Sequence, residues 1–475
     1  MPAEAYETMN KTFFTPAEAY EAIKKTFFTP AETYEAIKKT FFTPAEILLR
    51  PVLLFNAKIL FFQFSAYFSR HKIRTFETKI NKKMMIAQNL IHDYQMKWMR
   101  IQKVMQEKGA DGCLISNGIN LFYTTGHIYS GYFYLPAEGE PWYFVKRPNG
   151  LAGEHVVYLR KPEQLPDLFR ENGLQMPQHL LLEADELTYS DYTRLQTIFQ
   201  PQTTGNATAL LRQIRRVKTP WEIEQTRLCA RRHEAVYQEI PSCFRPGMTD
   251  LDFQFEIENR MRKHGSLGLF RAFGPNMDIY MGSILAGPNA ETPSPFDFAL
   301  GGGGMDASCP LGANGTPLEE GMAIMVDMAG NYTPYMTDMT RVYSVGKLSD
   351  EAYRAHEVSC RIHQETEAAA RPGVACADLY QLALRIVEEE GLAPYFMGTK
   401  QQAKFVGHGV GLQINELPVL TPRSKEILEE NMIFALEPKF VLPGIGAVGV
   451  ENTYLVTAQG CEKLTHAPEE IINLL

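Results

Sequence analysis

The segment VDMAGNYTPYMTDMTR, residues 326–341, places Asp327 and Asp338 in a stretch that otherwise has the pattern of a buried β-hairpin. The residues before Asn331 are apolar and strand-like, Asn331-Tyr332-Thr333-Pro334 is typical of a turn, and TDMTRVYSV has the pattern of a second strand. A fold back at Tyr332 and Thr333 would set the two acids opposite each other on one face. Such a pair is costly unless a shared proton, an arginine or lysine, or a metal ion lies between the carboxylates.

A second segment, MIFALEPKFVLPGIGAVGVENTYLV (residues 432–456), repeats this design with Glu437 and Glu451 on either side of a turn. Gly444 is the midpoint of that pair, so these two acids are also expected to face each other. A salt bridge to the nearby Arg341 would be enough for the first pair alone. One positive side chain cannot balance four converging carboxylates, whereas divalent cations can, and two ions that share bridging carboxylates do so best.

The chain around the two hairpins looks duplicated. RPGMTDLDFQFEIENRMRKHG (residues 245–265) and RPGVACADLYQLALRIVEEEG (residues 371–391) both begin with Arg-Pro-Gly and end with Gly. Each follows a predicted helix with its own start signal, at Thr219-Pro220-Trp221-Glu222 and at Ser349-Asp350-Glu351. Identities inside the repeat are few, so chance similarity is the alternative. The shared order of helix, Arg-Pro-Gly, helix and acid-bearing hairpin predicts two pseudo-symmetric halves that meet at a metal site.

Residues 210–470 resemble the pita-bread metallohydrolases, which include prolidase, aminopeptidase P, methionine aminopeptidase and creatinase, and the Xaa-Pro peptidases most of all. The matching segments are LRQIRRVKTPWEIEQTR (211–227), AGPNAETP (286–293), VDMAGNYTPYMTDMTR (326–341), VGHGVGLQINELP (406–418), FALEPKF (434–440) and VGVENTYLVTAQG (448–460). The resemblance implies an α/β (α+β) protein with a pseudo-symmetric pita-bread catalytic domain at residues 213–475. A creatinase-like α/β N-terminal domain, residues 84–212, is expected to precede it, because ISNGINLFYTTG (115–126) resembles that domain.

In this family two aspartates, one histidine and two glutamates hold two divalent ions, in that chain order. They map onto Asp327, Asp338, His408, Glu437 and Glu451. The small residues in Gly407-His408-Gly409-Val410-Gly411 permit close backbone approach, which favours a ligand over a loop histidine bonded to the backbone. Mn, Co, Zn and Fe all suit aspartate, glutamate and histidine ligands, so the sequence leaves the metal open. A water bridging two such ions would be activated for attack, and the resemblance implies Glu437 as the acceptor of its proton. Amide hydrolysis is the expected reaction.

Four positions depart from the prolidase and aminopeptidase P pattern. Histidines are replaced by Pro310, Lys404 and Asn415, and an arginine is replaced by Gly449. In the relatives these outer groups contact the substrate and help to carry protons, so altered substrate specificity is expected. Lys404 could meet a substrate carboxylate and Asn415 could donate to an oxyanion, but a solvated lysine and a turn asparagine are equally simple interpretations.

The first hypothesis is therefore a metallopeptidase of the Xaa-Pro type that acts on a small peptide or amide. A hydrolase or lyase acting on a non-peptide small molecule is the alternative favoured by the lost histidines. A non-catalytic binding homologue is the third, and the survival of all five ligands disfavours it. The family resemblance also implies a homodimer.

Composition agrees with an intracellular globular enzyme. Net charge is −8, so no nucleic-acid partner is expected, and seven cysteines, an odd number without a Cys-x-x-Cys motif, indicate a reducing, cytoplasmic compartment. Residues 1–83 form a repetitive leader in which TPAEAYEAIKKTFF recurs as TPAETYEAIKKTFF, and this leader is interpreted as dispensable. Its apolar stretch is interrupted by polar residues, so no membrane association is expected.

Overall fold

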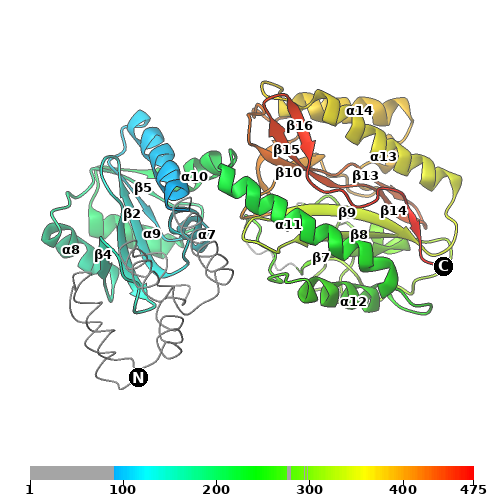
Figure 1. Cartoon of the computed structure of the whole chain (residues 1–475), viewed down its shortest axis with the longest axis horizontal. Helices are drawn as coiled ribbons and strands as arrows, with labels where there is room; N and C mark the ends of the chain where they lie inside the picture. The colour runs from blue at the N-terminus through cyan, green and yellow to red at the C-terminus, as the bar shows by residue number, and fades with distance from the viewer. Residues whose placement is uncertain (1–89, 275–279, 294, 297) are drawn as a thin grey trace, which may run out of the picture. The chain divides into compact units, whose positions relative to one another are not determined.

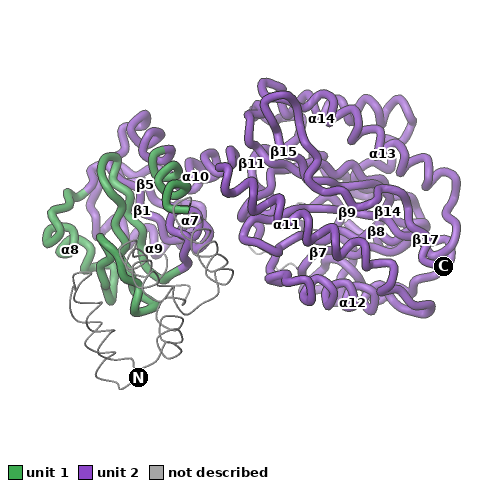
Figure 2. The backbone as a smooth tube through the Cα atoms, viewed as in Figure 1, with its two compact units in different colours: residues 1–99, 129–176 green, residues 100–128, 177–475 purple. Residues whose placement is uncertain are grey.

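The computed structural model describes residues 90–274, 280–293, 295–296 and 298–475. It divides into two compact units, residues 1–99 with 129–176 and residues 100–128 with 177–475 (Figure 2). The predicted leader, residues 1–83, lies outside the described residues. Within the described ranges, no helix is long and apolar enough to cross a membrane.

The first unit contains a β-hairpin with Glu138-Gly139 in its turn. Strands β2 (Ser130–Pro136) and β3 (Trp142–Arg147) pair antiparallel, and β4 (Val156–Tyr158) runs parallel to β3. Helix α8 (Leu165–Glu171) buries Phe169 against Tyr134 and Phe144 of this hairpin. Tyr134 and Phe144 therefore lie on the face of the hairpin that α8 covers.

The second unit begins with parallel strands β1 (Gly112–Ile115), β5 (His179–Leu182) and β6 (Thr203–Asn206). Strand β1 (GCLI) is apolar and fully buried, and β5 (HLLL) is apolar and buried after His179, as parallel strands inside a sheet require. The helices in this part are α7 (Gly118–Thr125), α9 (Tyr189–Phe199) and α10 (Ala207–Arg215).

Two helix pairs carry the predicted duplication. The first pair is α11 (Pro220–Glu239) and α12 (Asp250–Lys263), and the second is α13 (Asp350–Ala369) and α14 (Cys376–Glu389). The first helix has 20 residues and the second has 14 in both pairs. The predicted start signals are present, because Thr219 and Glu222 form a capping box and Ser349 accepts from the backbone of Ala352.

Each helix pair packs on its own sheet (Figure 1). Helices α11 and α12 cover a sheet of order β17-β9-β8-β7, and α13 and α14 lie against a sheet of order β11-β10-β12-β15-β16 and the separate pair β13-β14. The strands of the first sheet are β7 (Gly282–Ala286), β8 (Ala323–Gly330), β9 (Thr337–Ser344) and β17 (Ile472–Asn473). The others are β10 (Gly407–Gly409), β11 (Glu416–Leu420), β12 (Ile433–Leu436), β13 (Lys439–Leu442), β14 (Gly446–Gly449), β15 (Asn452–Thr457) and β16 (Gly460–Lys463).

The register of the first acid-bearing hairpin differs from the prediction by two residues. Asp327 on β8 pairs with Thr340 on β9, and Asp338 pairs with Ala329, so the two acids are not directly opposite. The connection turns later because residues beyond Thr333 are held from outside the hairpin: Tyr335 donates to Glu222 and the Met336 N–H donates to Gly411. A shift of two residues keeps both acids on one face, because side chains alternate with a period of two.

The second hairpin has the predicted register. Leu436 pairs with Asn452 in one sheet and Lys439 pairs with Gly449 in the other, so Glu437 and Glu451 lie at facing positions between these pairs. Gly444 lies at the turn with φ 77°, a backbone conformation that glycine adopts at little cost.

Candidate metal centre

The five predicted ligands lie together in the wall of one cavity. Asp327, Asp338, His408, Glu437 and Glu451 all line it, and its volume is about 530 Å³. Asp327 lies on β8, Asp338 on β9 and His408 on β10. Glu437 lies between β12 and β13, and Glu451 lies between β14 and β15. The pseudo-symmetric halves therefore bring together side chains that are up to 124 residues apart in sequence, Asp327 and Glu451 being the outermost.

Within the described part of the chain, these residues form two overlapping groups with the spacing of a metal site. One group is Asp338, His408 and Glu451, and the other is Asp327, Glu437 and Glu451. The ligand atoms of each group lie within 4.8 Å of one another. Glu451 belongs to both groups, so it occupies the position of a carboxylate shared between two cation sites.

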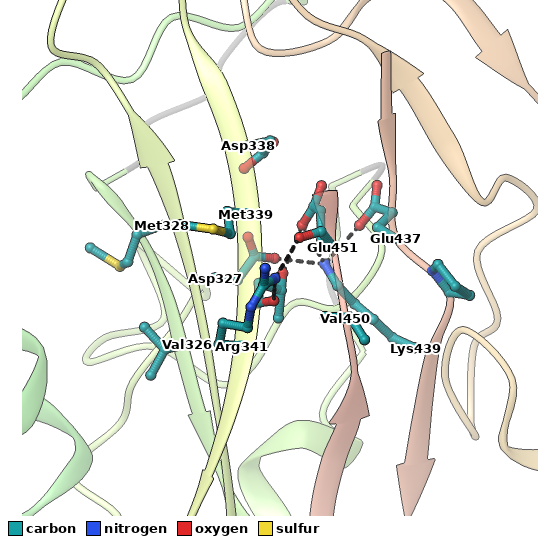
Figure 3. Close-up of polar contacts among 12 residues, drawn as sticks. Val326, Asp327, Met328, Asp338, Met339, Arg341, Glu437, Lys439, Val450 and Glu451 are labelled. Carbon is teal, nitrogen blue, oxygen red and sulfur yellow. Dashed lines mark hydrogen bonds and ion pairs between the residues drawn. The ribbon is translucent and has the colours of Figure 1, made fainter. Parts of the chain in front are cut away.

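A lysine that the sequence interpretation missed lies inside the second group. Lys439 Nζ is 2.8 Å from Asp327 Oδ2, 2.7 Å from Glu437 Oε2 and 3.2 Å from Glu451 Oε2 (Figure 3). Its side chain is 0% exposed. The signal was present in FALEPKF, because a lysine two residues after Glu437 in a strand-like apolar run points to the same side as the glutamate.

His408 contacts the oxygen of Glu437 that Lys439 does not use. Its Nε2 is 3.3 Å from Glu437 Oε1 and 3.9 Å from Asp338 Oδ2. Its Nδ1 lies 3.2 Å from the carbonyl oxygen of Gly409, which can accept a hydrogen bond only if Nδ1 carries the proton. With the proton of Nδ1 on Gly409, Nε2 is the ring atom that faces the carboxylates: protonated, it donates to Glu437, and deprotonated, it is the atom that could bind an ion.

The electrostatics of the centre differ from one side to the other. Burial would raise the pKa of Glu437, but Lys439 and His408 hold it at about 2. Burial raises the pKa of Glu451 to about 8, with repulsion from Glu437 adding to the effect against the attraction of Lys439. Burial and repulsion from Glu451 also raise the pKa of Asp338 well above its usual range. The carboxyl groups on the Asp338 side therefore resist ionisation unless a further cation lies beside them.

Lys439 remains an ammonium in this setting. Burial alone would lower its pKa, but attraction to Asp327, Glu437 and Glu451 raises it well above the ordinary value. The fourth acid, Asp338, is not among its hydrogen-bond partners.

Arg341 is not the counter-ion of the aspartates. It follows Asp338 by three residues on β9, so its side chain points to the opposite face of the strand. Its guanidinium donates to the carbonyl oxygens of Thr340, Glu451 and Ala467 and to the side chain of Asn452. The alternative of a simple Arg341 salt bridge for the aspartate pair is therefore wrong. Arg341 instead fixes the backbone on either side of the centre.

Asn415 reaches the same cavity as the five candidate ligands. Its Oδ1 accepts from the Phe273 N–H at 2.7 Å and its Nδ2 donates to the Phe273 carbonyl at 2.8 Å. Both ends of the amide are thus engaged with one backbone residue. Only the second N–H of Nδ2 could fill the predicted role of oxyanion donor while both of these hydrogen bonds stay in place.

Lys404 is not brought to the candidate ligands. It is exposed and lines a neighbouring cavity of about 260 Å³ with Phe296, Phe298 and Gly398. Gly449 pairs with Lys439 across β13 and β14, and a Cβ there would lie 2.5 Å from the Pro438 carbonyl oxygen. The arginine that the resemblance places at this position therefore does not fit this backbone.

The remaining cavity wall is aromatic, with one cation. Phe270, Phe273, Phe296, Phe298 and Phe405 line it. Arg212 also lines it, half-buried, with its guanidinium 3.7 Å from the centre of the Phe273 ring. The phenylalanines were not predicted as site residues, because isolated phenylalanines carry no periodic signal, and Arg212 was quoted only as part of the matching segment 211–227.

Comparisons with known families cover most of the described chain. Metallopeptidase family M24 matches residues 224–458, and the creatinase/prolidase N-terminal domain matches residues 97–217. The chain belongs to metallopeptidase family M24. The predicted relationship to the Xaa-Pro peptidases is confirmed, and so is the prediction of a metallopeptidase.

Individual relatives are distant but match along their whole length. Over 380 residues the chain is 24% identical to the Xaa-Pro dipeptidase of Pyrococcus furiosus, covering 78% of this chain and 98% of that protein. Solved structures of an Xaa-Pro dipeptidase from Bacillus anthracis and an X-Pro aminopeptidase from Thermotoga maritima MSB8 match with TM-scores of 0.68 and 0.64. Their identities are 24% and 23%, covering 80% and 77% of this chain and 100% and 98% of theirs. The predicted order of a creatinase-like domain and a pita-bread domain is confirmed.

Proposed function

We propose that the chain is a metal-dependent hydrolase that cleaves an amide or related C–N bond in a small substrate, with a specificity that differs from simple Xaa-Pro dipeptides. The observation that carries this proposal is the convergence of Asp338, His408, Glu437 and Glu451 beside an aromatic cavity. The family and the Xaa-Pro dipeptidase relative support an amide substrate.

The donor set suits a divalent cation. Oε1 of Glu451 is buried and has no hydrogen-bond partner among the described residues, while Oε2 is taken by Lys439 and Thr340. Together with His408 Nε2 and the Asp338 carboxylate it offers the mixed nitrogen and oxygen ligands that Mn, Co, Zn or Fe accept. The chemistry supplied by such an ion is polarisation of a carbonyl and acidification of water to a pKa of about 7.

The chain's own residues would handle the proton and the substrate. Glu437 is held ionised by Lys439 and His408, so it can accept the proton of an attacking water. The phenylalanines exclude water around the reacting carbonyl and favour an apolar substrate group. Arg212, in the same cavity, is the cation available to a substrate carboxylate.

A second candidate is cleavage of a non-peptide C–N bond, by hydrolysis or elimination. Among the described residues that line the cavity, His408 is the only histidine, and the Asn415 amide cannot release a proton to a leaving group at neutral pH. A poor leaving group such as a peptide amine needs a proton donor, whereas cleavage of an amidine or an activated amide depends less on such a donor. The homodimer, the cytoplasmic location and the lack of nucleic-acid or membrane partners stay predictions.

The test is kcat/KM for metal-loaded protein on Xaa-Pro dipeptides, longer peptides with proline second, and small amides and amidines. We expect Xaa-Pro dipeptides to be poor substrates, because loss of a general acid or base costs about 100- to 10,000-fold. Efficient turnover of these dipeptides, at about 10⁴ M⁻¹s⁻¹ or above, would show that the specificity is unaltered. No turnover of any compound, with metal bound, would favour a binding protein.

A further inference from the structure

The position of Lys439 limits how many metal ions the centre can hold. Its ammonium group makes hydrogen bonds to Asp327, Glu437 and Glu451, at 2.8, 2.7 and 3.2 Å. These three acids are also one of the two groups that could hold an ion. The lysine therefore occupies the same place, among the same oxygens, as one of the two ions that the family resemblance implies.

Lysine and a second ion cannot share this place. A transition-metal ion binds carboxylate oxygens at about 2.0–2.2 Å, so an ion bound by these oxygens would lie against the ammonium with no ligand between the two positive charges. The lysine cannot turn towards solvent, because its side chain is 0% exposed and strand β13 pairs with β14 beside it. Gly449, directly opposite, leaves room for this arrangement, since a Cβ there would come 3.0 Å from the Lys439 Cα.

The other half of the centre remains available to one ion. Each glutamate uses Oε2 for Lys439, while Glu437 Oε1 lies 3.3 Å from His408 Nε2 and Glu451 Oε1 is buried without a partner among the described residues. Asp338 contributes a carboxylate that Lys439 does not contact. Both glutamates thus present one oxygen to the lysine and one to the side where Asp338 and His408 lie.

We propose that this centre binds one divalent ion, through Asp338, His408 and Glu451 with Glu437 beside them, and that the Lys439 ammonium takes the place of a second ion next to Asp327. The proposal rests on the proposed function only for the presence of metal. Lys439 is a positioning residue, because an ammonium has three N–H donors and all three have carboxylate partners, which leaves none for a substrate.

The test is metal stoichiometry of the full chain, measured by elemental analysis after loading with Mn²⁺ and removal of free ions, with electron paramagnetic resonance of the same samples. The wild type is expected to hold about one ion per chain with the spectrum of an isolated Mn²⁺. Lys439→Met removes the ammonium at similar length and is expected to raise the content to about two, with the spectrum of a coupled pair. Lys439→Arg and the exposed-site control Lys425→Met should stay at one.

Two ions, or none, in the wild type would overturn the proposal, and so would a folded Lys439→Met protein that still holds one. The wild-type measurement decides the stoichiometry even if that variant does not fold. Hydrolysis is measured on the same samples. One ion without hydrolysis would count against the proposed function alone, and two ions with hydrolysis against the single-ion centre alone.

Discussion

Lys439 Nζ lies 2.7 Å from Oε2 of Glu437, the residue two positions earlier in the chain, and both side chains are buried. Alternation along an extended chain places the two side chains on one side, where the glutamate at the facing position, Glu451, also meets the lysine. The centre is therefore an acidic cluster with one half neutralised by a side chain of the protein.

Removing Lys439 should destabilise the metal-free protein. Lys439→Met leaves Asp327, Glu437 and Glu451 buried without their cation, and breaking a buried ion pair from one side costs about 3–5 kcal/mol. Urea unfolding in the presence of a chelator measures this loss, with Lys425→Met as the matched surface control. Added Mn²⁺ should restore part of the stability of the variant, because a ligand that binds only the folded state stabilises it. A variant as stable as the wild type in chelator would mean that the lysine is not the counter-ion of these acids.

Asp338 should be essential for the ion but not for the fold. Asp338→Ala removes a carboxylate that Lys439 does not neutralise, so we expect loss of tight metal binding and of hydrolysis, with an unfolding midpoint at or above that of the metal-free wild type. Titration calorimetry with Mn²⁺ checks the first point. Asp350→Asn, at a side chain that is 95% exposed, is the control that should bind metal normally. Full activity in Asp338→Ala would contradict the assignment of this residue as a ligand.

Asn415 should act on substrate positioning through Phe273. Asn415→Ala removes both hydrogen bonds to the Phe273 backbone, and misplacement of a cavity wall by about 1 Å can cost about 100-fold. We expect kcat/KM to fall by about 10- to 100-fold with metal content unchanged. Asn415→Asp keeps the acceptor but loses the donor, so its activity should lie between those of the wild type and the alanine variant. Equal activity of all three proteins would show that neither hydrogen bond matters for turnover.

A buried ion cluster outside the centre predicts a pH-dependent stability. Burial opposes ionisation of Glu416, but Arg215 and Lys218 hold its pKa at about 2, against an ordinary value of 4.5. Because the folded-state pKa is the lower one, the stabilisation is complete above about pH 4.5 and is lost as the pH falls towards 2. A depression of this size corresponds to about 3 kcal/mol.

Glu416→Gln should therefore be less stable than the wild type by about 3 kcal/mol at neutral pH, and the difference should shrink in acid. Urea unfolding at about pH 6, 4 and 3 follows this trend. The free-energy difference at pH 6 is expected to be the largest of the three. A difference that is constant across this range would mean that Glu416 does not titrate with a depressed pKa.

The sequence predicted the elements of the fold better than the arrangement inside the centre. Helix start signals at Thr219 and Ser349 are local, since the capping side chain and the backbone it binds are neighbours, and both were found. The turn at Gly444 was also found, because this glycine lies midway in sequence between Glu437 and Glu451 and glycine is typical of turns. The turn between Asp327 and Asp338 was displaced because contacts from Glu222 and Gly411, distant in sequence, hold its later residues.

The centre itself depends on which acid meets which cation, and that is a long-range property. Closeness in sequence suggested Arg341 as the cation, but strand alternation turns its side chain to the far face, where it binds backbone carbonyls. The same alternation applied to Glu437 and Lys439 would have placed the lysine with the acids. Asn415 and Phe273, 142 residues apart, could not be paired from sequence at all.

The most direct measurement is the anomalous X-ray scattering of crystals of the full chain loaded with Mn²⁺. A single-ion, metal-dependent centre predicts one peak per chain, bounded by Asp338, His408, Glu437 and Glu451, with Lys439 Nζ still among Asp327, Glu437 and Glu451. Two peaks with the lysine displaced would contradict the single-ion centre, and no peak at these residues would contradict metal binding altogether.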